Sequence, residues 1–155
     1  MAVKPIPDGY AAVTPYLVID GASAAIEYYK KVFGATERMR MDAPGGKVGH
    51  AELVIGGSTI MLADEFPQMG FRGPKAFGGS AVSLMLYVPN VDEVFKRATD
   101  AGAKQLKPLA DQFYGDRMGT IEDPFGHVWT IGTHIEDVSP EEMRRRSEKM
   151  MKQQA

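Results

Sequence analysis

The stretch VTPYLVIDGASAAIEYYKKVFGA, residues 13–35, reads as a buried strand followed by an amphipathic helix. Its first part is a short apolar run, residues 13–19, that Asp20-Gly21 ends. Apolar residues then recur at steps of three and four positions, as on one helix face: Ala22, Ala25, Ile26, Tyr29 and Phe33. Gly34 follows them and is placed to end the helix.

The same plan returns in the second half of the chain. VSLMLYV, residues 82–88, is another apolar strand, and Asn90 and Glu93 after it suit a helix cap and its third residue. A second apolar stripe follows, and Gly102 closes it: Val91, Val94, Phe95, Ala98 and Ala101.

One shift relates both ends of the repeated unit. Ser83 follows Thr14 by 69 positions, and Thr130 follows Met61 by the same 69. A single shift at both ends predicts an internal repeat of a strand, a helix and about three strands. We therefore expect an α+β fold of two βαβββ modules.

The modules are expected at about residues 10–66 and 81–135 of a single domain, residues 1–145. Residues 66–80, which hold four glycines and two prolines, are interpreted either as a plain linker or as a lid over a ligand site. A last helix is predicted at residues 139–152, with a serine cap and a proline at its first position. Its basic run is interpreted as a solvated face or a subunit contact: Arg144, Arg145, Arg146 and Lys149.

The composition is that of a soluble globular protein. Hydrophobic residues make up 44% of the 155 residues, and 18 basic against 20 acidic residues give a formal charge of −2. This balance does not favour nucleic acid or a membrane surface as a partner. Cysteine is absent, which excludes disulfides and thiolate chemistry, and no apolar run suits a signal peptide or membrane span. We expect a cytoplasmic protein.

Several short motifs carry a resemblance to a known family: GHAEL (49–53), IMLADE (60–65), DQFYGDR (111–117), EDPFGHVW (122–129) and EDVSPEEM (136–143). Together with the doubled βαβββ plan they resemble the vicinal oxygen chelate superfamily of glyoxalases, bleomycin-resistance proteins and dioxygenases, and within it the PhnB-like branch. The resemblance covers roughly residues 10–145. It implies a cup of curved mixed sheets with helices on the outer face and ligand on the concave inner face. It also implies a homodimer.

The resemblance further implies four metal ligands, one on the first and one on the last strand of each module. In this sequence those positions hold Thr14, Met61, Ser83 and Thr130. None is a histidine or a carboxylate, and hydroxyls and a thioether are poor ligands for zinc, nickel, magnesium or ferrous iron. We therefore expect no metal and no other cofactor.

Strand alternation predicts which side chains line the cup. They are Thr14, Tyr16, Val18, His50, Glu52, Val54, Thr59, Met61, Ala63, Ser83, Met85, Tyr87, Val128 and Thr130. The helix-covered side then receives Val13, Leu17, Ile19, Ala51, Leu53, Ile55, Ile60, Leu62, Trp129 and Ile131. Methionines are interpreted mainly as core filling, namely Met39, Met41, Met61, Met85 and Met118.

His50 and Glu52 are the principal polar pair of the predicted cup. We weigh a structural hydrogen bond, a ligand contact, a general base and a metal ligand for His50. His127 is expected on the helix side or in solvent, and His134 at the surface after the last strand. Asp123, Pro124, Phe125 and Gly126 together suit a tight turn.

Tyr114 and Arg117 could close the pocket and bind a carboxylate or phosphate. The alternative is that Asp116 and Arg117 pair with each other or stabilise a turn.

These features predict a metal-free protein that binds a small molecule, sequestering an aromatic or antibiotic-like compound. The predicted contacts are Tyr16, His50, Glu52, Met61, Met85, Tyr87, Tyr114 and Arg117. The alternative is a lyase or isomerase. It would use His50 as base, with Glu52 or Asp116 orienting it and Arg117 stabilising negative charge. Alternatively, it would use a metal held by displaced ligands drawn from His50, Glu52, Asp64 or Glu65. An interaction-only dimer is the remaining class.

Overall fold

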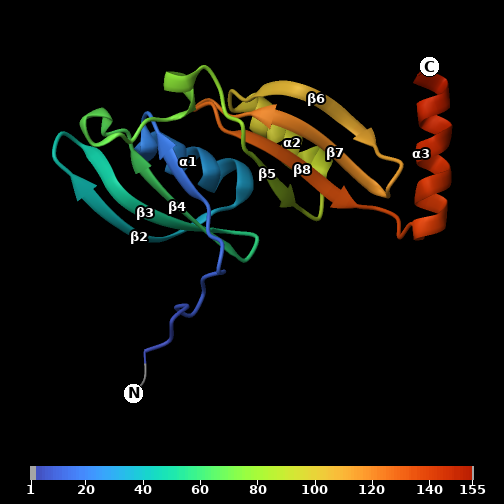
Figure 1. Ribbon diagram of the computed structural model, residues 1–155. Coiled ribbons are helices and arrows are strands. Elements are labelled where there is room, and N and C mark those ends of the chain that lie inside the picture. The colour runs from blue at the N-terminus through green and yellow to red at the C-terminus, as the bar shows by residue number, and fades with distance from the viewer. Residues whose placement is uncertain (1–2, 155) are drawn as a thin grey trace. The chain divides into compact units, whose positions relative to one another are not determined.

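A computed structural model describes residues 3–154 (Figure 1), so the first two residues of the domain predicted at 1–145 lie outside the described part. The chain forms two compact units. Unit 1 holds the residues up to Val82 together with Asp123–His127, and unit 2 holds Ser83–Glu122 and the residues from Val128 onward. Each unit carries a βαβββ module, which confirms the predicted α+β fold. Their action as a single domain stays a prediction.

Unit 1 is a four-stranded mixed sheet with one helix on one face (Figure 1). Its strands are β1 (Tyr16–Ile19), β2 (Thr36–Ala43), β3 (Lys47–Ile55) and β4 (Ser58–Asp64). Their order is β1-β4-β3-β2, and only β1 and β4 run parallel. The helix is α1 (Ala22–Phe33), and its whole predicted apolar stripe is buried. Gly34 ends it with a φ of 67°, a conformation that glycine adopts without strain, as predicted.

Unit 2 repeats this arrangement. Its strands are β5 (Ser83–Tyr87), β6 (Lys104–Asp111), β7 (Asp116–Glu122) and β8 (Val128–His134), in the order β5-β8-β7-β6. Helix α2 (Val91–Asp100) covers one face (Figure 1). The Asn90 side chain accepts a hydrogen bond from the amide of Glu93 at 3.2 Å, which confirms the predicted cap.

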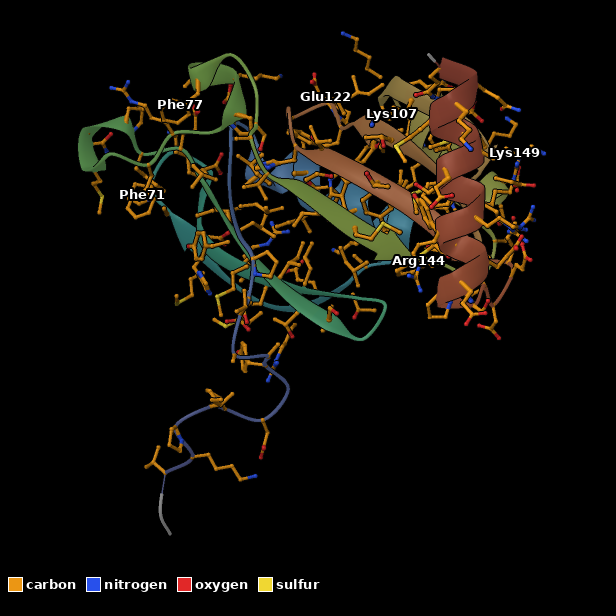
Figure 2. All side chains as sticks on the ribbon, turned by 45° about the vertical axis from the view of Figure 1, so that its right-hand side comes forward. Phe71, Phe77, Lys107, Glu122, Arg144 and Lys149 are labelled. Atoms are coloured by element: carbon orange, nitrogen blue, oxygen red, sulfur yellow. The ribbon has the colours of Figure 1, made fainter. Side chains whose placement is uncertain are left out.

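The C-terminal helix α3 (Pro140–Gln154) also begins as predicted. The hydroxyl of Ser139 accepts a hydrogen bond from the amide of Glu142 at 3.2 Å. No residue of α3 is buried, and Arg144 and Lys149 project from it (Figure 2). None of the helices within residues 3–154 is long and apolar enough to cross a membrane. A subunit contact through α3 stays a prediction.

The strand register confirms the internal repeat. Tyr16 pairs with Met61 in unit 1, and Met85 pairs with Thr130 in unit 2, so both partners are displaced by the same 69 positions. The two hairpins differ in their turns. Gly56-Gly57 joins β3 to β4 with positive φ at both residues, which suits a two-residue hairpin turn, whereas the turn between β7 and β8 is longer.

Burial separates the two faces of each sheet as the alternation predicts. Buried positions on the helix-covered faces include Leu17, Ile19, Ala51, Leu53, Ile55, Ile60, Leu62, Trp129 and Ile131. We call the opposite face of each sheet its open face. One boundary was wrong: Val13 and Thr14 precede β1, and Val13 is exposed. Pro15 explains this, because it has no amide hydrogen to donate to a strand ladder.

The turn between β7 and β8 belongs to unit 1. The amide of Gly126 donates to the carbonyl of Asp123 at 3.1 Å, which confirms the predicted tight turn. The buried Asp123 carboxylate accepts the hydroxyl of Tyr29 at 2.6 Å. His127 was predicted to face the helix side or solvent. It is half-exposed, and its Nε2 lies 3.1 Å from the carbonyl oxygen of Val18 on β1.

The segment between the modules contains two short 3₁₀ helices, at Pro67–Met69 and Pro74–Phe77. The amide of Gly73 donates to Oε1 of Glu65 at 2.7 Å, and a Cβ at Gly73 would come within 2.9 Å of a backbone oxygen of β1. The segment is therefore packed on unit 1. It carries the exposed side chains of Phe71 and Phe77 (Figure 2). Its action as a lid stays a prediction.

Candidate functional site

A chain of four polar side chains lies on the open face of unit 1. His50 and Glu52 stand two positions apart on β3, so both point to this face. Nε2 of His50 lies 3.2 Å from Oε1 of Glu52, and Nδ1 of His50 lies 3.0 Å from the hydroxyl of Tyr16 on β1. The hydroxyl of Tyr10 lies 2.5 Å from Oε2 of Glu52. The two residues singled out in the sequence are in contact, with a tyrosine at each end.

The ionisation of Glu52 decides which of these four hydrogen-bonded side chains donate and which accept. The hydrogen bond from Tyr10 holds the pKa of Glu52 below its ordinary value against the effect of burial, and the hydrogen bond from His50 adds to this. An ionised carboxylate only accepts hydrogen bonds. Tyr10 and Nε2 of His50 therefore both donate to it. The Nδ1 of a neutral His50 ring is then an acceptor, and it receives the hydroxyl of Tyr16, whose pKa burial raises.

Tyr10 comes from the N-terminal strap, which we define as residues 8–14. The guanidinium of Arg38 on β2 lies 4.4 Å from the centroid of the Tyr10 ring. The hydroxyl of Thr59 on β4 donates to the carbonyl of Gly9 at 2.8 Å. Sequence analysis missed Tyr10, because it precedes the first strand and its partner Glu52 is 42 positions away.

Exposed apolar groups lie beside these four hydrogen-bonded side chains. Tyr16 is 45% exposed and Met41 is 54% exposed, and Met39 beside Glu52 is also exposed. Met61 pairs with both Tyr16 and Glu52, so it lies between them in the strand register. The interpretation of Met39 and Met41 as core filling was wrong, because β2 is the edge strand and their partners on β3 face the open side.

A second polar network occupies the open face of unit 2. The hydroxyl of Tyr87 donates to Oδ2 of Asp116 at 2.7 Å, and Nδ1 of His134 lies 2.7 Å from Oδ1 of the same carboxylate. Nε2 of His134 lies 2.9 Å from Oδ1 of Asp137. His134 was predicted at the surface after the last strand. It is exposed as predicted, but it is the last residue of β8, and the alternation of β8 turns it toward the buried Asp116.

The charges of this second network support one another. Burial opposes the ionisation of Asp116, but the hydrogen bonds from Tyr87 and His134 outweigh it, so the pKa of Asp116 is lowered. The hydrogen bond to Asp137 raises the pKa of His134 most, and the hydrogen bond to Asp116 raises it further. Asp116 is thus hydrogen-bonded to Tyr87 and His134 within unit 2, and the carboxylate in contact with His50 is that of Glu52.

Arg117 and Tyr114 have partners other than those expected. Arg117 donates to Asp92 of α2 at 2.8 and 2.9 Å and to Asp111 at 3.0 Å, so it does not pair with its neighbour Asp116. This places it on the helix-covered side of the sheet, because adjacent residues of a strand face opposite sides. The hydroxyl of Tyr114 donates to the sulfur of Met118 at 2.9 Å. The predicted anion contact by Arg117 therefore has no place on the open face.

The comparisons with known proteins agree with this architecture. The sequence matches the Glyoxalase/Bleomycin resistance protein/Dioxygenase superfamily over residues 10–131. The chain belongs to this superfamily. An uncharacterized protein of Mycobacterium bovis is 44% identical over 136 residues, which span 86% of this chain and 90% of that protein.

Two solved structures are also similar. TioX from Micromonospora sp. ML1 is 29% identical with a TM-score of 0.63, over 81% of this chain and 99% of that one. The product of an Arabidopsis thaliana gene is 27% identical with a TM-score of 0.65, over 79% of this chain and 98% of that one.

The glyoxalase superfamily's metal positions do not fit a metal in this chain. The hydroxyl of Thr14 donates to a backbone carbonyl of its own loop at 3.0 Å. The hydroxyl of Thr130 lies 3.4 Å from that of Ser83 and 3.1 Å from that of Thr120, so these groups satisfy one another. Met61 offers a soft thioether. Within residues 3–154, no three histidine, aspartate or glutamate side chains cluster closely enough to hold a metal ion. The displaced-ligand hypothesis thus has no support among these residues.

Proposed function

We propose that this protein binds a small aromatic molecule without a metal and sequesters it, as an antibiotic-binding protein would. The observation that carries the proposal is the exposure of aromatic and thioether side chains on both open faces: Tyr16, Met39, Met41, Met85 and Tyr87. Exposed large apolar patches on monomeric proteins often mark binding sites, and ligand sites combine apolar side chains with a few polar groups. His50 and Glu52 supply those polar groups in unit 1.

The proposed contacts are narrower than the sequence alone indicated. Tyr16, His50, Glu52 and Met61 lie on the open face of unit 1, and Met85 and Tyr87 lie on that of unit 2. Arg117 leaves the set because its guanidinium is bound to Asp92 and Asp111, and Tyr114 leaves it because it lies in the turn between β6 and β7, outside the strands of the open face. A homodimer and a cytoplasmic location remain part of the proposal.

A thermal-shift screen of aromatic and antibiotic-like compounds tests this proposal. A ligand present at a hundred times its Kd stabilises the folded protein by about 2.7 kcal/mol, which raises the melting temperature. Tyr16→Ala or Tyr87→Ala should weaken the shift. Phe77→Ala is the matched control, because Phe77 is 70% exposed but lies outside both open faces. Shifts that need an added metal, or that Phe77→Ala reduces as much as Tyr16→Ala, would contradict the proposal.

A metal-independent enzyme is the second candidate, and one observation favours it. Glu52 orients His50 so that its Nδ1 faces the hydroxyl of Tyr16, as a general base and an adjacent proton donor would stand. The test is a screen of lyase, isomerase and hydrolase substrates against the wild type and His50→Ala. His134→Ala is the matched control, since it also removes a carboxylate-bound histidine. Equal turnover by the wild type and His50→Ala would remove this candidate.

A further inference from the structure

Tyr10 occupies a position in which its phenol ring is recognised at both its face and its hydroxyl. The Arg38 guanidinium lies over the ring, 4.4 Å from its centroid. The hydroxyl donates to Oε2 of Glu52 at 2.5 Å, and Glu52 is only 4% exposed. A cation over a ring face and an ionised acceptor at a hydroxyl are the two features that a protein site for a free phenol needs.

The N-terminal strap that delivers Tyr10 is held by few contacts. It belongs to no strand in the described range, residues 3–154. Thr59 donates to the carbonyl of Gly9 at 2.8 Å, and Arg38 donates to the carbonyls of Asp8 and Gly9 at 3.3 and 3.5 Å. These are side-chain tethers rather than a strand ladder. Segments held in this way open at low free-energy cost compared with core strands.

We propose that Tyr10 is an internal occupant of a phenol subsite, and that the ligand of unit 1 is a phenolic compound that replaces it when the strap lifts. This inference rests on the proposed aromatic ligand and names its chemical class. The site selects against other aromatic compounds by charge. Glu52 repels an aromatic carboxylate, the Arg38 guanidinium repels an aromatic cation, and an aromatic hydrocarbon leaves Oε2 of the buried Glu52 without the donor that Tyr10 supplies.

The strap then sets the apparent affinity. A ligand that binds only the open state has an apparent Kd equal to its intrinsic Kd divided by the open fraction. Removing Tyr10, or loosening the strap, should therefore tighten the binding of a phenol.

The probes are p-cresol, which has the same ring and hydroxyl as a tyrosine side chain, and toluene, which lacks the hydroxyl. Binding to the full chain is measured by calorimetry for the wild type, Tyr10→Ala and Thr59→Val. Tyr10→Ala should bind p-cresol roughly tenfold more tightly than the wild type does, and toluene roughly tenfold more weakly than p-cresol, as a hydrogen bond to a charged group implies. Thr59→Val, which keeps Tyr10 but removes a tether, should also tighten p-cresol binding. Tyr114→Ala is the matched control and should not change it.

Two results would overturn the inference: equal p-cresol affinity for the wild type and Tyr10→Ala, or toluene binding as tightly as p-cresol. Should Tyr10→Ala fail to fold, Thr59→Val decides, since unchanged p-cresol affinity in that variant also overturns it. The proposed function fails separately, when no aromatic compound of the thermal-shift screen binds in a manner that depends on Tyr16 or Tyr87. Aromatic ligands that bind the open faces without preferring phenols would contradict the phenol subsite and leave the proposed function standing.

Discussion

Asp64, the last residue of β4, joins three parts of unit 1 through one buried carboxylate. Its Oδ1 accepts the amides of Gly21 and Ala22 at 3.1 and 3.0 Å, where α1 begins. Its Oδ2 accepts the amide of Val48 at 2.7 Å, where β3 begins. Asp64→Asn keeps one oxygen for the helix, but it places an amide NH₂ group against the N–H of Val48. We expect this single change to destabilise the fold.

The magnitude follows from the bonds that change. A hydrogen bond to a charged group contributes about 1.5–3 kcal/mol, and a negative charge at a helix N-terminus adds about 0.3–1 kcal/mol. Asp64→Asn should therefore lower the free energy of unfolding by about 2–4 kcal/mol. For a chain of this size, that corresponds to a melting temperature roughly 5–15 °C lower. Asp64→Ala loses all three bonds and should cost more.

Urea unfolding followed by circular dichroism measures this loss. Thr133→Ala is the matched control, because the hydroxyl of Thr133 accepts the amide of Val91 at 2.9 Å at the equivalent start of α2. That hydroxyl is neutral, accepts one amide and donates to the carbonyl of Val88 at 2.7 Å, so its loss should cost less than the loss of Asp64, about 1–2 kcal/mol. If Asp64→Asn unfolds within about 0.5 kcal/mol of the wild type, as surface substitutions do, the reasoning is refuted.

Three further predictions concern packing and charge. Gly119→Ala would place a Cβ 2.6 Å from an aromatic carbon of α2, so thermal unfolding should show a loss of about 1–3 kcal/mol; an unchanged melting temperature contradicts this. The pKa of His134 is raised chiefly by Asp137, so its stabilising effect is complete below about pH 6.5 and is lost as the pH rises through the folded-state pKa. Asp137→Asn should lower the NMR titration midpoint of His134, and an unmoved midpoint would disprove the pairing. The pKa of Glu52 is lowered, so its contribution is present above its ordinary value of 4.5 and is lost as the pH falls through the folded-state pKa. Tyr10→Phe should raise that pKa and move acid unfolding to higher pH, and an identical acid midpoint would count against it.

Local sequence signals were sufficient for the elements and their faces. The spacing of Ile26, Tyr29 and Phe33 identified a helix face, and Gly34 and Asn90 identified helix ends, because these features depend on residues within one or two turns. The alternation along β3 placed His50 and Glu52 on one face for the same reason.

The polar networks could not be read from such patterns. Asp116 stands next to Arg117 in the chain, yet it is bound to His134, 18 positions away, and to Tyr87, 29 positions away. Arg117 turns to Asp92 of α2, because the alternation of β7 puts the two neighbours on opposite faces. The partner of a long side chain depends on which strands and helices lie beside it, and strand pairing sets that.

The sequence by itself determined the repeat, the two βαβββ modules and the absence of ligand residues at the superfamily's metal positions, because periodicity, a fixed 69-residue shift and residue chemistry are local or countable properties. Only the tertiary structure decided what surrounds His50 and Glu52. Tyr10 reaches Glu52 from a segment that belongs to no strand in the described part of the chain, and Tyr16 reaches His50 from β1 across the intervening β4. Contacts between residues 34 and 42 positions apart arise when the chain folds back on itself, and no local pattern encodes them.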